Sequence, residues 1–459
     1  MIGLENYVPI VVPSVVVLIV SILVLPLRSF KAVVALGSFS LVASIISELY
    51  GYFLGLQPYS LFSSQVRIDL TYYLFSLITD VTGLFVILGT YSVIQDWPTR
   101  NSFVSLTLLT ILGIHYLSAF QSVPMFLMGW GISSAAVYAL AMLSKDRLSV
   151  VAGVKYLVMG VISSSLIVLG LAFFVAFTGS LSFVGVQVNS GVIIAVILLS
   201  VAFMFKLGTF PFHTWLPDLY SKGDRGSLIA VASIGKLVAV APFVRVLTLL
   251  DPTPALTQTE IEVFSVLAIA TLIFGNVMAF GRKDLSEMIA YSSVAQAGYF
   301  LLAFAMISVS PAPAFIGLIT QTLTYTIAQA GIFAGIAYIE KSSGSSEYKA
   351  LRGFASGDRL AAFSFIVLLL SLLGVPPIIG FWAKLYIFES TFPYPILTIL
   401  GLLNSAASAG YYIQPFREMF AGGKWNVVPS PERATLVGAA FLSITLGLYL
   451  PLLLVGVTI

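Results

Sequence analysis

Long apolar stretches recur from one end of this chain to the other, and they limit the folds that it can adopt. A helix needs about 20 apolar residues to cross the hydrocarbon core of a bilayer. Charged residues make up only 9% of the sequence, whereas soluble domains carry about 25%. The pattern therefore predicts an all-α integral membrane protein with about fourteen transmembrane helices. The apolar windows lie near residues 8–27, 32–55, 73–94, 102–120, 123–143, 154–178, 190–218, 227–249, 260–280, 288–308, 312–339, 360–388, 394–415 and 434–458.

The first apolar stretch also has the composition of a signal peptide. It follows Glu5 rather than basic residues, and no small-residue cleavage site comes after it. We therefore interpret residues 8–26 as the first membrane span.

The basic residues alternate between loops. When each loop is numbered by the span that it follows, the even-numbered loops and their edges hold Arg67 and Arg245, and nearly all other basic residues lie in odd-numbered loops. Cytoplasmic loops are enriched in Lys and Arg. The odd-numbered loops are therefore expected to face the cytoplasm, which places the chain in the cell membrane as a multi-pass protein with both termini outside.

Three lysines fit neither set of loops, because Lys206, Lys236 and Lys384 lie inside apolar spans. A lysine at the bilayer centre costs about 2.5–3.5 kcal/mol on insertion scales. Lys236 lies about nine residues from the start of its span, near mid-membrane, from where its side chain cannot easily reach water. These lysines are predicted to line an ion path. The alternative is structural pairing with acids hidden in the bundle.

Two of these lysines lie beside predicted helix breaks. Gly208, Pro211 and Pro217 interrupt the seventh span at Lys206, and the segment "GVPPIIGF" interrupts the twelfth before Lys384. Broken helices at membrane depth expose backbone groups that can line a watery cavity or bind ions. Because desolvation favours the neutral amine, a buried lysine can take up and release a proton. A row of such lysines predicts a proton path.

Other ionisable residues in the spans are weaker candidates for the proton path. His213, between Pro211 and Pro217, either relays protons or is satisfied by a freed carbonyl. Asp80 either pairs with a lysine or a backbone amide, or caps a local kink. His115 is expected to be a satisfied core histidine. The remaining two acids, Glu48 and Glu389, are expected to be solvated near the ends of their spans.

The residues missing from the sequence exclude several classes of cofactor site. The chain has no cysteine and two histidines, which excludes disulfides, thiolate iron–sulfur ligation and cysteine zinc sites. A net charge of +3 gives no nucleic-acid footprint. We expect no cofactor or metal on this chain, a lipid bilayer as its environment, and any redox centre on a partner subunit.

Several motifs, in order and spacing, resemble the antiporter-like membrane subunits of respiratory complex I, which are proton-conducting membrane transporters. The likeness covers most of residues 100–415. It rests on "KYLVMGVISSSLIVLG" (155–170), "FKLGTFPFHTWLPDLY" (205–220), "SIGKLVAVAPFVRVL" (233–247), "GNVMAFGRKDLSEMIAYSSVAQAGYFLLAF" (275–304), "LRGF" (351–354), "LLGVPPIIGFWAKLYIF" (372–388) and "LNSAASAGYY" (403–412).

The resemblance implies a domain organisation and a site. It implies two inverted five-helix repeats with broken helices 7 and 12. The expected divisions are helices 1–3 (1–100), the first repeat (101–250), the second, inverted repeat (251–415), and a C-terminal loop with helix 14 (416–459). Lys206, Lys236 and Lys384 match the family's lysines on the seventh, eighth and twelfth helices.

The resemblance also implies a subunit type and partners. Lysine at position 384 and an end at Ile459, without a long lateral helix, look most like the N-type subunit. The expected partners are antiporter-like L- and M-type subunits and a small K-type subunit. Quinone, iron–sulfur clusters and, as an open option, flavin would sit on partner subunits. The chain itself would do no redox chemistry but would belong to a translocase.

The sequence departs from the family at the fifth helix. Aligned on Ser134 and Tyr138 in "MFLMGWGISSAAVYAL", the glutamate that pairs with the seventh-helix lysine falls at Gly131. Gln296 replaces a common histidine. Three functions therefore stay open. The first is a proton-translocating subunit of a complex I-like quinone oxidoreductase. The others are a subunit of a multi-subunit cation/proton antiporter or membrane-bound hydrogenase, and a structural spacer with a degenerate channel.

Overall fold

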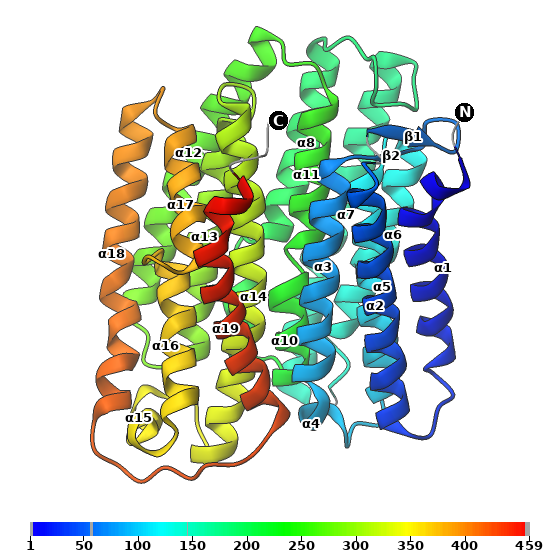
Figure 1. Cartoon of the computed structure of the whole chain (residues 1–459). Coiled ribbons are helices and arrows are strands. Elements are labelled where there is room, and N and C mark those ends of the chain that lie inside the picture. The colour runs from blue at the N-terminus through cyan, green and yellow to red at the C-terminus, as the bar shows by residue number, and fades with distance from the viewer. Residues whose placement is uncertain (1–2, 56–57, 145, 455–459) are drawn as a thin grey trace. The chain divides into compact units, whose positions relative to one another are not determined.

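The computed structural model describes residues 3–55, 58–144 and 146–454, and helices dominate it (Figure 1). In this part of the chain 13 helices are long and apolar enough to cross a membrane. The twelfth predicted span is present as two shorter helices, α16 (Arg359–Leu373) and α17 (Ile379–Ser390). Each predicted span thus corresponds to a helix or a helix pair, and the predicted fold class is confirmed. Residues 455–458 of the last predicted span lie outside the described residues.

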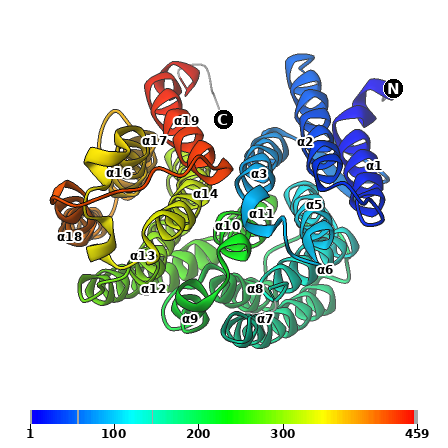
Figure 2. The same cartoon turned by 90° about the horizontal axis from the view of Figure 1, so that it is seen from below.

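The first of two compact units comprises Met1–Leu207 and Ile234–Leu256. Helix α11 is its core: it packs against α3, α5, α6 and α8 (Figure 2), and its residues from Leu237 to Leu247 are buried. The elements of this unit are η1 (Leu4–Tyr7), α1 (Val8–Leu23), α2 (Phe30–Phe53), β1 (Tyr59–Leu61), β2 (Val66–Ile68), α3 (Leu70–Gly89), α4 (Tyr91–Ile94), α5 (Arg100–Ala119), α6 (Val123–Leu140), α7 (Arg147–Thr178), α8 (Ser190–Leu207) and α11 (Leu237–Leu249). Strands β1 and β2 form an antiparallel hairpin.

The second unit comprises Gly208–Ser233 and Thr257–Ile459. Helix α14 is central in this unit and packs against α13, α16, α17 and α19. Besides α16 and α17, the unit holds α9 (Trp215–Lys222), most of α10 (Arg225–Ile234) and α12 (Pro254–Phe280), α13 (Leu285–Ala305), α14 (Pro311–Ser343), η2 (Tyr348–Leu351), α15 (Phe354–Gly357), α18 (Pro395–Phe420) and α19 (Pro431–Leu454). The division into 1–100, 101–250, 251–415 and 416–459 and the inverted repeats stay predictions.

Polar residues mark where several helices begin. The side chains of Asp69, Ser122, Asp146, Asp284 and Asp358 each accept a hydrogen bond from a backbone N–H in the first turn of the following helix. The first four N–H groups of a helix have no partner within the helix, so these caps stabilise the boundaries.

Both predicted helix breaks are present, and the structure adds a third. Helix α8 ends at Leu207, and α16 ends before Gly374. Gly208 and Gly374 have φ values of +72° and +90°, in the left-handed region that a glycine adopts without strain. The third interruption, Gly235–Lys236, separates α10 from α11 within the eighth span. This interruption was not predicted, because the segment contains no proline.

Asp358 joins three helices of the second unit. Its carboxylate caps α16 and accepts hydrogen bonds from Tyr338 (2.7 Å) and from the Nε and Nη2 atoms of Arg433 (2.6 and 2.9 Å). Burial alone would raise the pKa of Asp358, but the hydrogen bonds from Arg433 and Tyr338 outweigh it and lower the pKa. The carboxylate therefore stays ionised and holds α14, α16 and α19 together.

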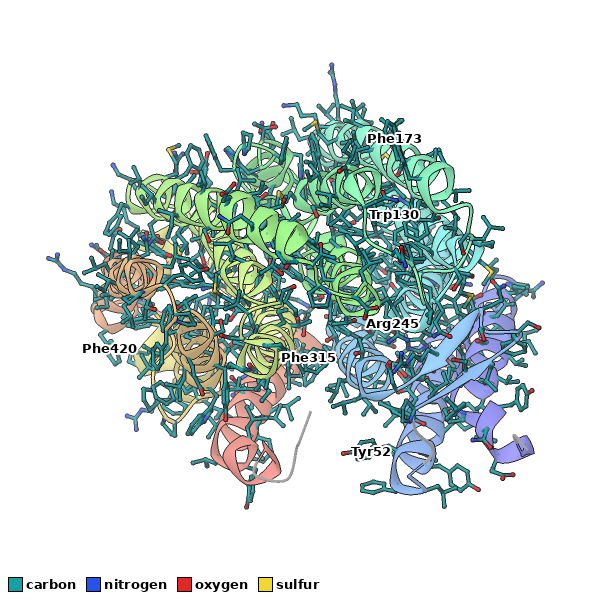
Figure 3. The ribbon with its side chains drawn as sticks, turned by 90° about the horizontal axis from the view of Figure 1, so that it is seen from above. Tyr52, Trp130, Phe173, Arg245, Phe315 and Phe420 are labelled. Atoms are coloured by element: carbon teal, nitrogen blue, oxygen red, sulfur yellow. The ribbon has the colours of Figure 1, made fainter. Side chains whose placement is uncertain are left out.

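Arg245 holds several elements of the first unit together, as Asp358 does in the second. Its guanidinium is 1% exposed and lies inside the unit (Figure 3). It pairs with Asp69, the cap of α3, at 2.6 Å, and donates to the Arg67 carbonyl at 2.8 Å. It also donates to the carbonyls of Phe120 (3.2 Å) and Ala119 (3.4 Å) at the end of α5. One side chain thus ties α11 to α3, α5 and the hairpin.

We predict that Arg245→Met lowers the thermal unfolding temperature of the detergent-purified protein. The change leaves the Asp69 carboxylate and three carbonyls without their buried donor, and breaking a buried pair costs roughly 3–5 kcal/mol. Arg67→Met is the matched control, because Arg67 pairs with the same carboxylate at 3.2 Å but its side chain is 38% exposed. An exposed pair contributes about 0–1 kcal/mol. Equal shifts in the two variants would contradict this role of Arg245.

Candidate functional site: buried lysines at helix interruptions

Lys384 is held by the broken end of α16. Its side chain is 4% exposed, and its Nζ donates to the Leu373 carbonyl at 2.9 Å and to the Ser405 hydroxyl at 2.8 Å. The last four carbonyls of a helix have no partner within the helix and carry partial negative charge. Because α16 stops in mid-span, it presents such carbonyls to Lys384. The break therefore creates the binding place for the ammonium group.

Gln296 also donates a hydrogen bond to a carbonyl at the end of α16. Its Nε2 donates to the Leu372 carbonyl at 2.8 Å, and its Oε1 accepts from Gln321 Nε2 at 2.9 Å. The sequence indicated only that a histidine was replaced at this position. The structure shows that an amide suits it, since one end donates to a carbonyl while the other accepts.

Two groups of hydrogen-bonded buried hydroxyls lie in the second unit, and the first begins at Gln296. The Tyr412 hydroxyl lies 3.4 Å from Gln296 Nε2 and 2.5 Å from the Ser292 hydroxyl. On the neighbouring residue of α13, the Ser293 hydroxyl bonds to Tyr325 at 2.7 Å. The Tyr325 hydroxyl in turn lies 3.4 Å from that of Tyr220. These polar side chains come from α9, α13, α14 and α18.

Lys206 lies among aromatic rings instead of polar atoms. It is 2% exposed in the last turn of α8, and its Nζ has no hydrogen-bond partner among the described residues. The Nζ lies 3.8 Å from the ring centroid of Tyr138, 5.2 Å from that of Tyr156 and 6.0 Å from that of Trp130. A desolvated ammonium over aromatic faces gains about 2 kcal/mol or more. The rings thus favour the charged form where the family's glutamate is missing.

Gly131, the position of that glutamate, lies on an open part of α6. The residue is exposed, and a Cβ atom built there would meet no other atom within 4 Å. Two residues earlier, a Cβ at Gly129 would lie 2.9 Å from the Gly113 carbonyl and 3.0 Å from Leu117. The missing acid is therefore not replaced by another side chain packed onto Gly131 within the described chain.

Lys236 lies within the third interruption. It is 3% exposed and caps α11, and its carbonyl accepts hydrogen bonds from Ala239 and Val240 at 3.0 Å. All three lysines therefore lie at or against a helix end inside a span. The sequence predicted this position for Lys206 and Lys384, and the structure shows it for Lys236 as well.

His213 lies in the segment between α8 and α9. It is 8% exposed, and its ring packs against Phe274, with centroids 4.2 Å apart. Its Nδ1 has no hydrogen-bond partner among the described residues. The expected bond to a freed carbonyl is therefore not formed at this nitrogen, and the relay role stays a prediction.

Asp80 has a partner that the sequence did not suggest. Its Oδ1 lies 3.0 Å from His115 Nε2, and its Oδ2 has no hydrogen-bond partner among the described residues. Glu48 lies nearby, with Oε1 3.9 Å from the same nitrogen. Glu48 is 0% exposed, so the expectation of a solvated position is wrong, whereas Glu389 is exposed as predicted. His115 is satisfied at only one ring nitrogen.

The predicted site residues are distributed over both units. Lys206, Lys236 and Asp80 belong to the first unit, whereas His213 and Lys384 belong to the second. A continuous row of lysines therefore stays a prediction.

Comparison with known proteins decides the family. Residues 121–408 match the family described as "NADH:quinone oxidoreductase/Mrp antiporter, TM". The chain belongs to this family. Subunit N of the NADH-quinone oxidoreductase of Desulfitobacterium hafniense is 28% identical over 93% of this chain and 91% of its own length. Subunit N of the F(420)H(2) dehydrogenase of Methanosarcina mazei is 30% identical over 85% of this chain and 83% of its own.

Solved structures agree with this family assignment. A chain of respiratory complex I from Thermus thermophilus with bound aureothin is 27% identical, with a TM-score of 0.82 over 97% of this chain and 98% of that one. A chain of the Mrp complex from Dietzia sp. has a TM-score of 0.86 over 99% of this chain and 96% of that one, at 18% identity. The latter likeness shows the shared fold.

We predict that Gly131→Ala leaves thermal stability unchanged or slightly higher. The added methyl group meets no atom, and replacing a mid-helix glycine by alanine gains roughly 0.5–1 kcal/mol. Gly129→Ala, two residues away on the same helix, is the control. It should lower the unfolding temperature, because overpacking costs about 1–3 kcal/mol. Both variants are compared by thermal unfolding in detergent, and a larger loss at Gly131 would show that this position is not open.

Proposed function

We propose that this chain is the proton-translocating, N-type membrane subunit of a complex I-like quinone oxidoreductase. Electron transfer in partner subunits would drive protons along Lys206, Lys236 and Lys384. The observation that carries this proposal is that each of the three lysines is buried at or against an interrupted helix. Two relatives named subunit N, which match most of the chain, support the subunit type.

The surroundings of Lys384 support a proton-transfer role. Its ammonium form is stabilised by the Leu373 carbonyl and the Ser405 hydroxyl, whereas burial favours the neutral amine. With these opposing effects, a small change in the field at the site is enough to move the proton. Hydroxyl groups such as Tyr412 and Ser292 can both donate and accept, and they would pass the proton on. Gln296 would position them without changing its own charge.

Lys206 would use aromatic rings in place of an acid. In the family pattern, a fifth-helix glutamate stabilises the charged lysine, but position 131 is glycine. The Tyr138 ring at 3.8 Å supplies a weaker attraction to the ammonium group. The proton on Lys206 would therefore be held less firmly than in members with the glutamate. His213 and Asp80 remain candidates for the same proton path.

The assembly around the chain follows from the same proposal. The partners would be antiporter-like L- and M-type subunits and a small K-type subunit in the cytoplasmic membrane, with both termini of this chain outside. Quinone, iron–sulfur clusters and, in some assemblies, flavin would be on those partners. The relatives include subunits of an NADH-quinone oxidoreductase and of an F(420)H(2) dehydrogenase, so the electron donor is set elsewhere in the complex.

Two other functions compete with this one. A subunit of a cation/proton antiporter or of a membrane-bound hydrogenase would have the same fold, and the likeness to an Mrp complex chain keeps that option open. A structural spacer with a degenerate channel is the second, favoured by Gly131. The aromatic rings around Lys206 argue against the structural spacer. If the lysine had no function, an apolar side chain would pack among these rings equally well.

We predict that Lys236→Ala uncouples proton translocation from electron transfer. In sealed native vesicles, the number of protons moved per electron should fall, because the change removes the central titratable group. Lys222→Ala is the control, since Lys222 is 47% exposed and pairs with Asp218 one turn away. An unchanged proton yield in Lys236→Ala would refute the lysine path, and normal pumping after replacement of all three lysines would favour the spacer.

Gentle detergent purification from the native membrane tests the assembly. Mass spectrometry of the copurifying proteins should find quinone-site and iron–sulfur subunits. Copurification of membrane antiporter subunits alone, without any redox protein, would instead support the cation/proton antiporter function.

A further inference from the structure

A cluster of three ionisable side chains, none of them a lysine, lies in the first unit. Glu48 on α2, Asp80 on α3 and His115 on α5 bring carboxylate and imidazole atoms within 4.8 Å of one another. Each of the three is at most 1% exposed. The His115 Nε2 lies 3.0 Å from Asp80 Oδ1 and 3.9 Å from Glu48 Oε1. The three helices pack against one another, so the cluster is built by the fold.

Several polar atoms of these three side chains have no hydrogen-bond partner among the described residues. Both carboxylate oxygens of Glu48, Asp80 Oδ2 and His115 Nδ1 are buried and unpaired within the described chain. The hydroxyls of Ser44 and Ser76 lie beside the Glu48 carboxylate and are buried as well. Burying polar groups without partners is costly, so such a concentration of them points to a ligand.

No positive side chain balances the two carboxylates. Within the described residues, neither Glu48 nor Asp80 forms an ion pair with a lysine or an arginine. The nearby Tyr72 hydroxyl is used elsewhere, because it donates to the Pro9 carbonyl at 2.5 Å. Two ionised carboxylates this close repel each other strongly in a medium of low dielectric constant. The cluster must therefore bind a proton or a metal ion.

The contacts of His115 favour a proton. A histidine that binds a metal almost always donates its other ring N–H to a carboxylate, a carbonyl or water. Here the second nitrogen, Nδ1, has no carboxylate or carbonyl partner among the described residues, whereas Nε2 is at hydrogen-bond distance from Asp80. This matches a neutral imidazole that donates from Nε2 and leaves Nδ1 as an unpaired acceptor.

We propose that Glu48 and Asp80 share one bound proton and form a proton-binding site separate from the three lysines. One of the two carboxyls holds the proton, which removes the repulsion between them, and His115 Nε2–H donates to Asp80 and holds it in place. The hydroxyls of Ser44 and Ser76 can donate to Glu48 when the proton leaves. The site is thus able to bind and release a proton without any group on α8, α11 or α17. This inference does not depend on the lysine path.

Infrared spectroscopy of the whole purified complex at neutral pH tests the proposal. The wild-type spectrum minus that of Glu48→Gln should contain the C=O band of a protonated carboxyl, and this band should shift when H₂O is exchanged for D₂O. Asp80→Asn, which keeps the shape of the side chain, should change the same band. Glu389→Gln is the control: its side chain is exposed and lies outside the cluster, so no such band should be lost.

Two further measurements complete the test. His115→Gln keeps a donor toward Asp80, so the band should persist with a changed frequency even if Glu48→Gln fails to assemble. Inductively coupled plasma mass spectrometry measures the metals in the same preparations. Absence of the carboxyl band from the wild-type difference spectra, or a metal that is present in wild-type protein and lost in Asp80→Asn, would overturn the proposal. A band abolished by added sodium ions would do the same.

Discussion

The hydrogen-bonding needs of backbone groups inside the bilayer determine how this protein holds its buried charges. A spanning helix satisfies its own backbone, whereas an interrupted helix exposes carbonyls that must find donors within the protein. Here the donors at the end of α16 are the Lys384 ammonium group and the Gln296 amide. The break and the lysine therefore stabilise each other: the helix end needs a donor, and the buried cation needs acceptors. Gly374 makes this arrangement possible, because a Cβ there would lie 2.8 Å from the Lys384 side chain.

The features that could be predicted from the sequence are those that depend on local properties of the chain. Apolar length, prolines at the seventh and twelfth spans, and lysines within spans are all local properties, so the spans, two breaks and the three lysines could be predicted. The Gly235–Lys236 interruption could not, because neither residue forbids a helix. The Tyr138 ring over Lys206 and the pairing of Asp80 with His115 depend on which helices pack together. Glu48 was misjudged for a related reason: its nearness to a helix end suggested water, but α3 and α5 cover it.

The buried charges of the first unit fall into two kinds. Arg245 has an acid and three carbonyls as partners, so its charge is compensated and fixed in one state. Among the described residues, Lys206 Nζ has aromatic rings but no hydrogen-bond partner around it, and the carboxylates of Glu48 and Asp80 share one imidazole. Groups of the second kind can change their protonation without breaking a network of strong bonds. The distinction separates side chains that maintain the fold from those suited to ion transfer.

The contacts of Arg245 also bear on how the protein is made. The Phe120 carbonyl and the Asp69 carboxylate, to which it donates, precede it by 125 and 176 residues. The ribosome therefore delivers the start of α3 and the end of α5 to the membrane well before their donor exists. Until the eighth span has been inserted, these groups must rely on water or on an insertion chaperone. The early helices can enter the bilayer one by one, but they reach their final packing only when α11 joins them, which makes that step a checkpoint in biogenesis.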